Sequence, residues 1–270
     1  MVCHIYVRLQ YLDGMVSINI HFLVEGKGDP ITLIHGVGSN LKSWDHVVQR
    51  LKSNFTVLRM DLRGQGQSKG ITDDCTLENF VEDVLEAMDN ADFSKAHLIG
   101  FSLGGMIAQL FALTHPERIN RLALISSVAG RNTEEKKRLA DRAKTIREEG
   151  VGAVIGASDQ RWFTDAFRQA NPEKVEKRLQ QLLANDPASY AIAYRIFAES
   201  EVGDRIHAIP HQTLIATGEN DVGSNTRMAK FMHDQIQNSE LVIFPELRHS
   251  LLVEAPDLVA DLLLKFLSVP

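Results

Sequence analysis

One stretch, AHLIGFSLGG at positions 96–105, constrains the fold more than any other part of the sequence. A short apolar run, typical of a buried strand, stops at Gly100-Phe101-Ser102-Leu103-Gly104, and a helical pattern follows at once. A strand that turns directly into a helix forces the residue at the turn into strained backbone angles, and flanking glycines let strand and helix pass closely. The stretch therefore predicts an exposed serine nucleophile, Ser102, although serine between glycines also occurs in ordinary tight turns.

Short β-rich runs alternate with helical patterns in the first half of the chain, and strand patterns return near its end. The expected strands are 15–24, 31–34, 56–60, 96–99, 121–126, 213–217 and 241–244. The expected helices are 44–51, 76–91, 104–114 and 257–267. This alternation predicts an α/β fold with a mostly parallel sheet and helices on both faces.

The segment between about residues 132 and 201 has a different character. Its stretches EEKKRLADRAKTIREEG, PEKVEKRLQQLLAND and ASYAIAYRIFAE are charged or amphipathic, and none of them has a strand pattern. Because strand patterns resume after it, this helical segment interrupts one sheet. We expect a core domain formed by residues 1–130 and 203–270, and an inserted helical cap formed by residues 131–202.

Composition limits the classes of binding partner and the cellular compartment that we expect for this protein. The chain has 270 residues, 44% of them hydrophobic, and a net charge of −6, so it offers no basic face for nucleic acid or an anionic membrane. Cys3 and Cys75 make no disulfide framework, and no apolar run approaches membrane-spanning length. We expect an untargeted cytoplasmic protein that acts on a small molecule, and its sequence leaves open whether it forms a homo-oligomer.

A serine hydroxyl needs a base within hydrogen-bond reach, and the base needs an acid that orients it. His249, in RHSLLVEAP, and Asp221, in TGENDVG, each follow an expected strand, which is where open α/β sheets place their sites. The chain order Ser, Asp, His is that of the α/β-hydrolases. Asp204 and Glu219 are alternative acids, and any of these side chains could instead be a solvated loop residue.

Acyl transfer also needs donors for the developing oxyanion. The backbone N–H of Leu103, at the start of the helix, is one candidate, and the N–H of Val37, in the tight turn His35-Gly36-Val37-Gly38, is the second. We expect His35 to support this turn rather than to act as a base. The glycine-rich turn DLRGQGQS at 61–68 lacks the lysine of a phosphate-binding loop and does not indicate nucleotide binding.

Taken together, HGVG, DLRGQGQS, GFSLGG, GENDVG and RHSLLVEAP resemble the α/β-hydrolase family in content, order and position, from about Val16 to the C-terminus. The resemblance implies an α/β-hydrolase fold with Ser102 as the nucleophile, His249 as the base and Asp221 as the acid that orients it. A serine at this turn counts against dehalogenation. It does not separate hydrolases from hydroxynitrile lyases, carbon–carbon hydrolases, cofactor-free oxygenases or hormone receptors of the same family.

The inserted segment, with DQRWFT at 159–164 and LLANDPASYAIAYRIFAE at 182–199, is similar to the cap of 3-oxoadipate enol-lactonases and related small carboxylesterases. By resemblance, Arg161 and Trp162 contact substrate. The alternatives are a solvated Arg161 and packing of Trp162, Phe163 and Phe167 between cap and core. The acid turn DVGSN lacks the proline that often follows this aspartate in such relatives, which leaves the lactone specificity open.

These observations predict a carboxylic ester hydrolase that cleaves a small ester or lactone through an acyl-enzyme. We expect such a hydrolase to need no cofactor. We also expect no metal site, because the histidines show no metal-ligand spacing. Two alternatives use the same residues: a carbon–carbon bond hydrolase acting on a dienoic diketone, and a ligand-binding receptor whose cap is a partner surface.

Overall fold

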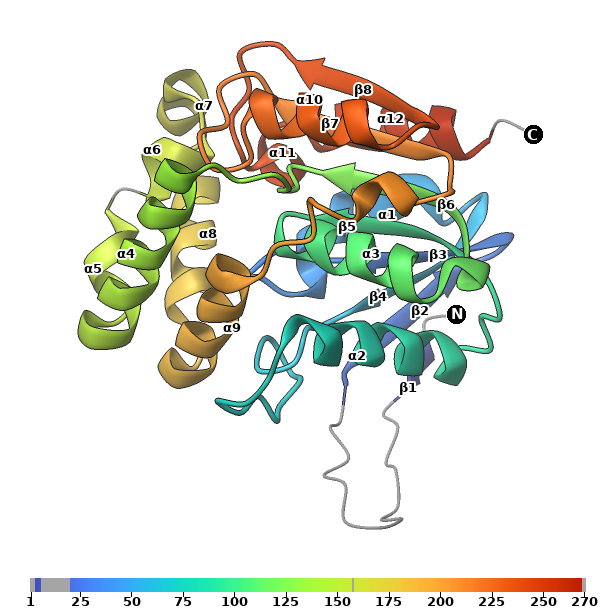
Figure 1. Ribbon diagram of the computed structural model, residues 1–270, viewed down its shortest axis with the longest axis horizontal. Coiled ribbons are helices and arrows are strands. Elements are labelled where there is room, and N and C mark those ends of the chain that lie inside the picture. The colour runs from blue at the N-terminus through green and yellow to red at the C-terminus, as the bar shows by residue number, and fades with distance from the viewer. Residues whose placement is uncertain (1–2, 6–19, 157, 269–270) are drawn as a thin grey trace.

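One sheet of eight strands runs through the part of the chain that this computed structural model describes, residues 3–5, 20–156 and 158–268 (Figure 1). Its order is β1-β2-β4-β3-β5-β6-β7-β8. β2 pairs antiparallel with β1 and β4, and all other neighbours are parallel. The strands are β1 (Cys3–Ile5), β2 (Phe22–Gly26), β3 (Asp29–Ile34), β4 (Phe55–Met60), β5 (Ala96–Phe101), β6 (Ile119–Ile125), β7 (Thr213–Gly218) and β8 (Ser239–Phe244). The parallel strands bring the loops after β3, β5, β7 and β8 to one edge of the sheet.

Helices cover both faces of this sheet. α1 (Asp45–Leu51) and α12 (Pro256–Leu267) pack on one face, where their apolar residues share a buried cluster. α2 (Leu77–Asn90), α3 (Leu103–Thr114) and α10 (Thr226–Gln235) contribute to the cluster on the other face. The remaining described elements near the core are α11 (Leu251–Glu254) and the 3-10 turns Leu41–Trp44, Pro116–Arg118 and Ile206–Ala208.

The segment between β6 and β7 contains helices and, within its described residues, no strand. These helices are α4 (Thr133–Glu149), α5 (Gly152–Ile155), α6 (Ser158–Trp162), α7 (Asp165–Ala170), α8 (Pro172–Leu183) and α9 (Pro187–Glu199). Figure 1 shows them gathered at one end of the sheet, at the left of the view. We call this group the cap; it lies over the edge where the parallel strands end.

Local sequence explains most of the element boundaries. Thr76 caps α2 in a capping box with Asn79, whose side chain accepts the Thr76 N–H at 3.0 Å. The predicted helix 44–51 is divided in the structure: a 3-10 turn ends at Trp44, and α1 begins at Asp45. The predicted strand 15–24 overlaps β2, which begins only at Phe22, because Ser68 Oγ accepts the backbone N–H of His21 at 2.9 Å. Residues 15–19 lie outside the described part.

Candidate active site

Ser102 occupies the sharp turn between β5 and α3. Its backbone angles are φ 55° and ψ −114°, a left-handed conformation that non-glycine residues rarely adopt. A Cβ atom at Gly100 would lie 2.1 Å from the Gly104 carbonyl oxygen, and one at Gly104 would lie 2.3 Å from the Ile34 carbonyl oxygen. The two glycines are therefore needed for β5, α3 and β3 to approach this closely, and that approach holds Ser102 at the floor of a cavity.

Asp221 and His249 meet at the same edge of the sheet. Asp221 follows β7, His249 follows β8, and His249 Nδ1 lies 2.7 Å from Asp221 Oδ2. The other carboxylate oxygen accepts the backbone N–H groups of Gly223 at 2.8 Å and Ser224 at 2.9 Å. Burial alone would raise the pKa of Asp221, but the charge and hydrogen bond of His249, with these two N–H groups, hold the pKa below its usual range.

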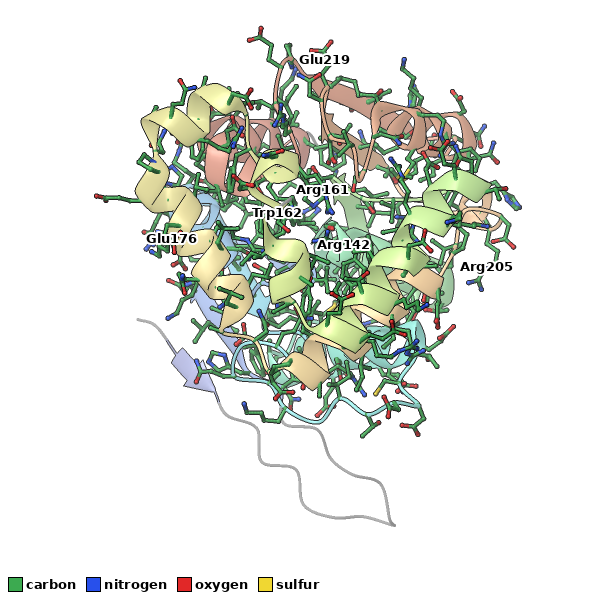
Figure 2. All side chains as sticks on the ribbon, turned by 90° about the vertical axis from the view of Figure 1, so that its left-hand side faces the viewer. Arg142, Arg161, Trp162, Glu176, Arg205 and Glu219 are labelled. Carbon is green, nitrogen blue, oxygen red and sulfur yellow. The ribbon has the colours of Figure 1, made fainter. Side chains whose placement is uncertain are left out.

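The alternative acids lie elsewhere. Glu219 is exposed and accepts the backbone N–H of Glu246 at 2.9 Å, and Figure 2 shows it at the periphery. Asp204 is also exposed, in the connection that leads back from the cap. Of the three acids considered from sequence, Asp221 is the one that pairs with His249.

The loop that carries His249 is fastened to the cap on both sides of the histidine. Arg248 donates to the carbonyl oxygens of Gln160 and Phe163, the latter at 3.0 Å, and the Ser250 N–H donates to the Trp162 carbonyl at 2.9 Å. The ring of Phe101 packs against the imidazole with centroids 5.1 Å apart. These contacts fix the ring of His249 above the turn that carries Ser102.

Ser102 and His249 line the same cavity, with the second ring nitrogen of His249 not engaged by Asp221. Within the described residues, no hydrogen bond joins the Ser102 hydroxyl to the imidazole. Catalytic hydrogen bonds are often long in unliganded sites and shorten when substrate binds. The serine of the strained turn, the imidazole and the buried carboxylate that pairs with it thus lie at one site.

Two backbone N–H groups flank Ser102. Leu103 is the first residue of α3, and Val37 lies in the loop after β3. A Cβ atom at Gly36 would lie 3.0 Å from Ser102 Cβ, which shows how closely this loop passes the nucleophile. Within the described residues, neither N–H takes part in a hydrogen bond of a turn or loop. Both N–H groups are therefore unused by the turns and loops around the cavity.

The loop that carries Val37 is braced from two sides. The Gly38 N–H donates to Gln65 Oε1 at 2.6 Å, and the Gly38 carbonyl accepts from Arg178 of α8 at 3.1 Å. His35 is fully buried: its Nδ1 lies 2.8 Å from the Gly36 carbonyl, and its Nε2 accepts the Leu62 N–H at 3.0 Å. Burial lowers the pKa of His35. Both nitrogens are occupied, so His35 supports the loop and cannot serve as a base.

The glycine-rich turn at 61–68 is a structural brace. The Asp61 carboxylate accepts the N–H groups of Leu41 at 2.7 Å and Gln67 at 2.9 Å, and pairs with His21 at 2.8 Å. A Cβ atom at Gly66 would lie 2.4 Å from that carboxylate. The polar groups of this turn are therefore bonded to other parts of the protein, and they hold the loop that carries Val37.

The cavity has a volume of about 500 Å³ and lies between core and cap. Arg161 and Trp162 of α6 both line it, and the Arg178 guanidinium stacks on the Trp162 ring at 4.5 Å. Phe163 is fully buried and stacks on Phe167 at 5.3 Å, and neither lines the cavity. Trp162 thus lines the cavity, whereas its neighbour Phe163 packs in the interior.

Sequence reasoning missed several lining residues from the cap. Burial raises the pKa of Tyr190 and Tyr194, whose phenols stay protonated at neutral pH. Their four-residue spacing in ASYAIAYRIFAE, which places both on one helix face, was the available signal. Apart from Arg161, which the cap resemblance indicated, no comparable signal marks the basic residues that the cavity gathers in an acidic protein. They are Lys42, Arg142, Arg161, Lys174, Lys177 and Arg178, against the carboxylates Asp45 and Asp221.

The described residues contain no group of three or more His, Cys, Asp or Glu side chains placed to hold a metal ion. None of the helices in this part of the chain has the length and apolar character needed to cross a bilayer.

Known proteins resemble this chain over most of its length. Residues 29–256 match a family model described as alpha/beta hydrolase fold. The chain is 28% identical over 246 residues to (E)-2-((N-methylformamido)methylene)succinate hydrolase of Acinetobacter baylyi, covering 88% of this chain and 90% of the relative. It is 29% identical over 269 residues to 2-hydroxy-6-oxononadienedioate/2-hydroxy-6-oxononatrienedioate hydrolase of Escherichia coli, covering 94% and 92%. The enol-lactonase of Burkholderia xenovorans superposes with a TM-score of 0.88 at 25% identity, covering 93% of this chain and 97% of that one.

Proposed function

The chain belongs to the alpha/beta hydrolase fold family, and on that premise we propose that it is a serine hydrolase that opens a small carboxylic ester or lactone through an acyl-enzyme. The observation that carries the proposal is the 2.7 Å contact between His249 and the buried Asp221, in the same cavity as Ser102. A histidine in an ordinary surface loop would not pair with a buried carboxylate in a cavity that a strained serine also lines. The enol-lactonase likeness of the fold supports a small substrate.

The reaction proceeds in two halves. His249 takes the proton of Ser102 as its oxygen bonds to the carbonyl carbon, and Asp221 orients and stabilises the charged imidazole. The N–H groups of Val37 and Leu103 stabilise the tetrahedral oxyanion. The carbon–oxygen bond of the ester then breaks, and His249 gives its proton to the leaving alcohol. With a lactone, that alcohol stays attached to the acyl group.

Water completes the reaction. His249 removes a proton from water as the hydroxide oxygen bonds to the acyl carbon, a second oxyanion forms in the same place, and the ester bond to Ser102 breaks with return of the proton. The product is a free carboxylic acid, and no cofactor takes part in any step.

The test is hydrolysis by purified wild-type protein and the Ser102→Ala variant on short p-nitrophenyl esters and on small lactones, an enol-lactone included. We expect kcat/KM to fall by about ten-thousand-fold or more in Ser102→Ala, because the nucleophile is gone while the fold remains. Ser53→Ala, at an exposed turn, is the matched control and keeps the wild-type rate. A fluorophosphonate that labels wild-type protein but not Ser102→Ala supports the same assignment by mass. Wild-type rates in a clean Ser102→Ala preparation would refute it.

A carbon–carbon hydrolase is the second candidate, because the Escherichia coli relative is named for dienedioate substrates. Those substrates are strongly coloured, so absorbance on mixing follows their cleavage directly. Rapid bleaching of a dienoic diketone together with inactivity on esters and lactones would favour this reaction over ester cleavage.

A further inference from the structure

Ser126, the residue that follows β6, has an unusual backbone conformation. Its φ is 44°, and among the non-glycine residues of the described chain only Asp92, Ser102 and Glu246 also have positive φ. Asp92 and Glu246 lie in exposed turns, whereas Ser102 and Ser126 are buried. Positive φ is strained for serine and free of strain for glycine, and such strain persists where the surrounding structure imposes it. The strain at Ser126 therefore calls for an explanation in what this residue contacts.

The backbone at the end of β6 is bonded to both neighbouring strands. β6 lies between β5 and β7 in the sheet (Figure 1). On one side, the Ile125 carbonyl accepts the Ser102 N–H at 3.0 Å. On the other side, the Ser126 N–H donates to the Ala216 carbonyl of β7 at 2.7 Å, and β7 leads to the loop that holds Asp221. The end of β6 thus contacts the serine turn and the strand that precedes the acid.

The hydroxyl group of Ser126 adds a contact with the base. Ser126 Oγ donates to the backbone carbonyl of His249 at 3.3 Å, and that carbonyl also accepts the Leu251 N–H at 2.9 Å. The two residues beside the histidine, Arg248 and Ser250, are hydrogen-bonded to the cap. Because Ser126 belongs to the core, its hydroxyl holds the backbone of His249 from the side opposite to the cap contacts.

We propose that Ser126 is a positioning residue for His249, and that its hydroxyl is the reason why a strained serine stands where glycine would fit. Its effect on rate rests on the proposed hydrolysis, whereas its effect on the position of the histidine does not. Ser126 is not among the residues that line the cavity, so it acts through His249 and not on substrate. The backbone of His249 determines where its ring lies, and a displacement of about 1 Å can cost about a hundredfold in rate.

The first experiment measures hydrolysis of a short p-nitrophenyl ester and urea unfolding for two variants, Ser126→Gly and Ser126→Ala. Both variants lack the hydroxyl, and we expect kcat to fall about tenfold in each, with KM within about twofold of wild type. Glycine adopts positive φ without strain, so the urea midpoint of Ser126→Gly should equal or exceed that of wild type. A residue that only supported the fold would give the opposite result, a lower midpoint with an unchanged kcat.

Ser127→Ala is the matched control. Ser127 is buried next to Ser126, and its Oγ accepts a hydrogen bond from Gln109 Nε2 at 2.9 Å. Loss of this hydroxyl should leave kcat within about twofold of wild type. Wild-type kcat in both Ser126 variants overturns the proposal. A loss in Ser126→Gly with none in Ser126→Ala also overturns it, because the freedom of the glycine backbone would then be responsible and not the hydroxyl.

The second experiment observes the histidine without turnover. The pKa of Asp221 is held below its usual range, so its carboxylate only accepts, and the proton between Asp221 and His249 lies on Nδ1. A proton NMR spectrum of the wild-type protein should show this proton far downfield, and its loss in His249→Gln identifies it. We expect an upfield shift and faster exchange with water in Ser126→Gly, and no change in Ser127→Ala. An unchanged signal in Ser126→Gly overturns the positioning of His249.

The two experiments separate the two proposals. Inactivity of the wild-type protein on every ester and lactone, with a His249 signal that shifts in Ser126→Gly, leaves the positioning standing and refutes the hydrolysis. Ester hydrolysis at the wild-type rate by both Ser126 variants leaves the hydrolysis standing and refutes the positioning.

Discussion

At the scale of single residues, the site depends on how little space surrounds the Ser102 turn. A non-glycine residue at φ 55° is strained, and the strain persists because the backbones around it are packed too tightly to relax. At Gly104 the helix α3 passes so close to the end of β3 that a side chain would meet the carbonyl oxygens of Ile34 at 2.3 Å and His35 at 2.7 Å. Both contacts are with backbone, which cannot rotate away.

Gly104→Ala should therefore cost about 3 kcal/mol of unfolding free energy, the upper part of the range for overpacking. It should also lower hydrolytic activity, because α3 carries Leu103 and its N–H. Gly152→Ala is the matched control, since no atom lies within 4 Å of a Cβ placed there. In α5 this control should be neutral or stabilising by about 0.5 kcal/mol. Urea unfolding of the two variants measures the difference, and equal midpoints would mean that the packing at Gly104 relaxes.

Sequence predicted the individual groups unevenly, for physical reasons. Ser102 could be singled out from the sequence because a strand that turns directly into a helix constrains the residue types on both sides of the turn. Asp221 was only one of three nearby acids, because the choice depends on which carboxylate reaches His249 after folding. Arg142 carries no local signal at all: on a charged helix it reads like any solvated arginine, and only the packing of α4 over the cavity distinguishes it.

At the scale of elements, the cap helix α8 and the loop after β3 act as one unit. Arg178 donates to the Gly38 carbonyl, while Leu182 and Tyr190 lie so close that a Cβ at Gly38 would meet them at 2.5 and 2.6 Å. On the other side, Gln65 accepts the Gly38 N–H. Burial lowers the pKa of Arg178 to about 10, so its side chain is charged at neutral pH. The cap thereby fixes the loop that carries Val37.

Arg178→Met should lower kcat for a neutral ester by about tenfold, the loss of one charge-assisted hydrogen bond, with a smaller change in KM. The reason is that the loop loses its hydrogen bond to the cap, so the Val37 N–H is positioned less accurately for the oxyanion. Arg178→Lys should recover part of the rate, because a lysine can still donate to the Gly38 carbonyl. If KM rises and kcat stays the same, Arg178 contacts the substrate instead of positioning the loop.

Strands were easier to predict than the helices around them. Parallel strands buried on both faces are continuous apolar runs, and most observed boundaries lie within two residues of those expected. α10 was missed, although Met228, Ala229 and Met232 have helical spacing and Asn225 caps the helix by accepting the Met228 N–H at 3.0 Å. The short helices α5, α6 and α7 were not separable from sequence, because pieces of four to six residues are too short to show a helical period.

At the scale of the whole molecule, the cap is joined to the core by a shared buried apolar cluster and by polar contacts at its edges. Arg227 of α10 pairs with Glu135 of α4, which also accepts from Asn225 at 2.8 Å. The two connections between cap and core meet at Glu201, whose carboxylate accepts four backbone N–H groups: those of Gly130, Arg131, Val202 and Gly203, at distances of 2.9 to 3.1 Å. One side chain thus ties the segment that enters the cap to the segment that leaves it.

Glu201→Ala should loosen the cap without unfolding the sheet, because it leaves those four N–H groups to water. We expect a loss of about 1 to 3 kcal/mol and faster hydrogen exchange in α4 and α9, while amides of β3, β5 and β6 keep their protection. Glu199→Ala, two residues earlier, removes only an exposed partner of Arg195 and should change stability by less than about 0.5 kcal/mol. Because α4 carries Arg142 and the following cap segments carry Arg161 and Arg178, a cap that opens more often should also bind substrate less tightly, so KM should rise together with the exchange rate. If hydrogen exchange in α4 and α9 matches the Glu199→Ala control, Glu201 does not hold the two connections together. The contact between Arg227 and Glu135 would then be the polar contact that holds α4 on the core.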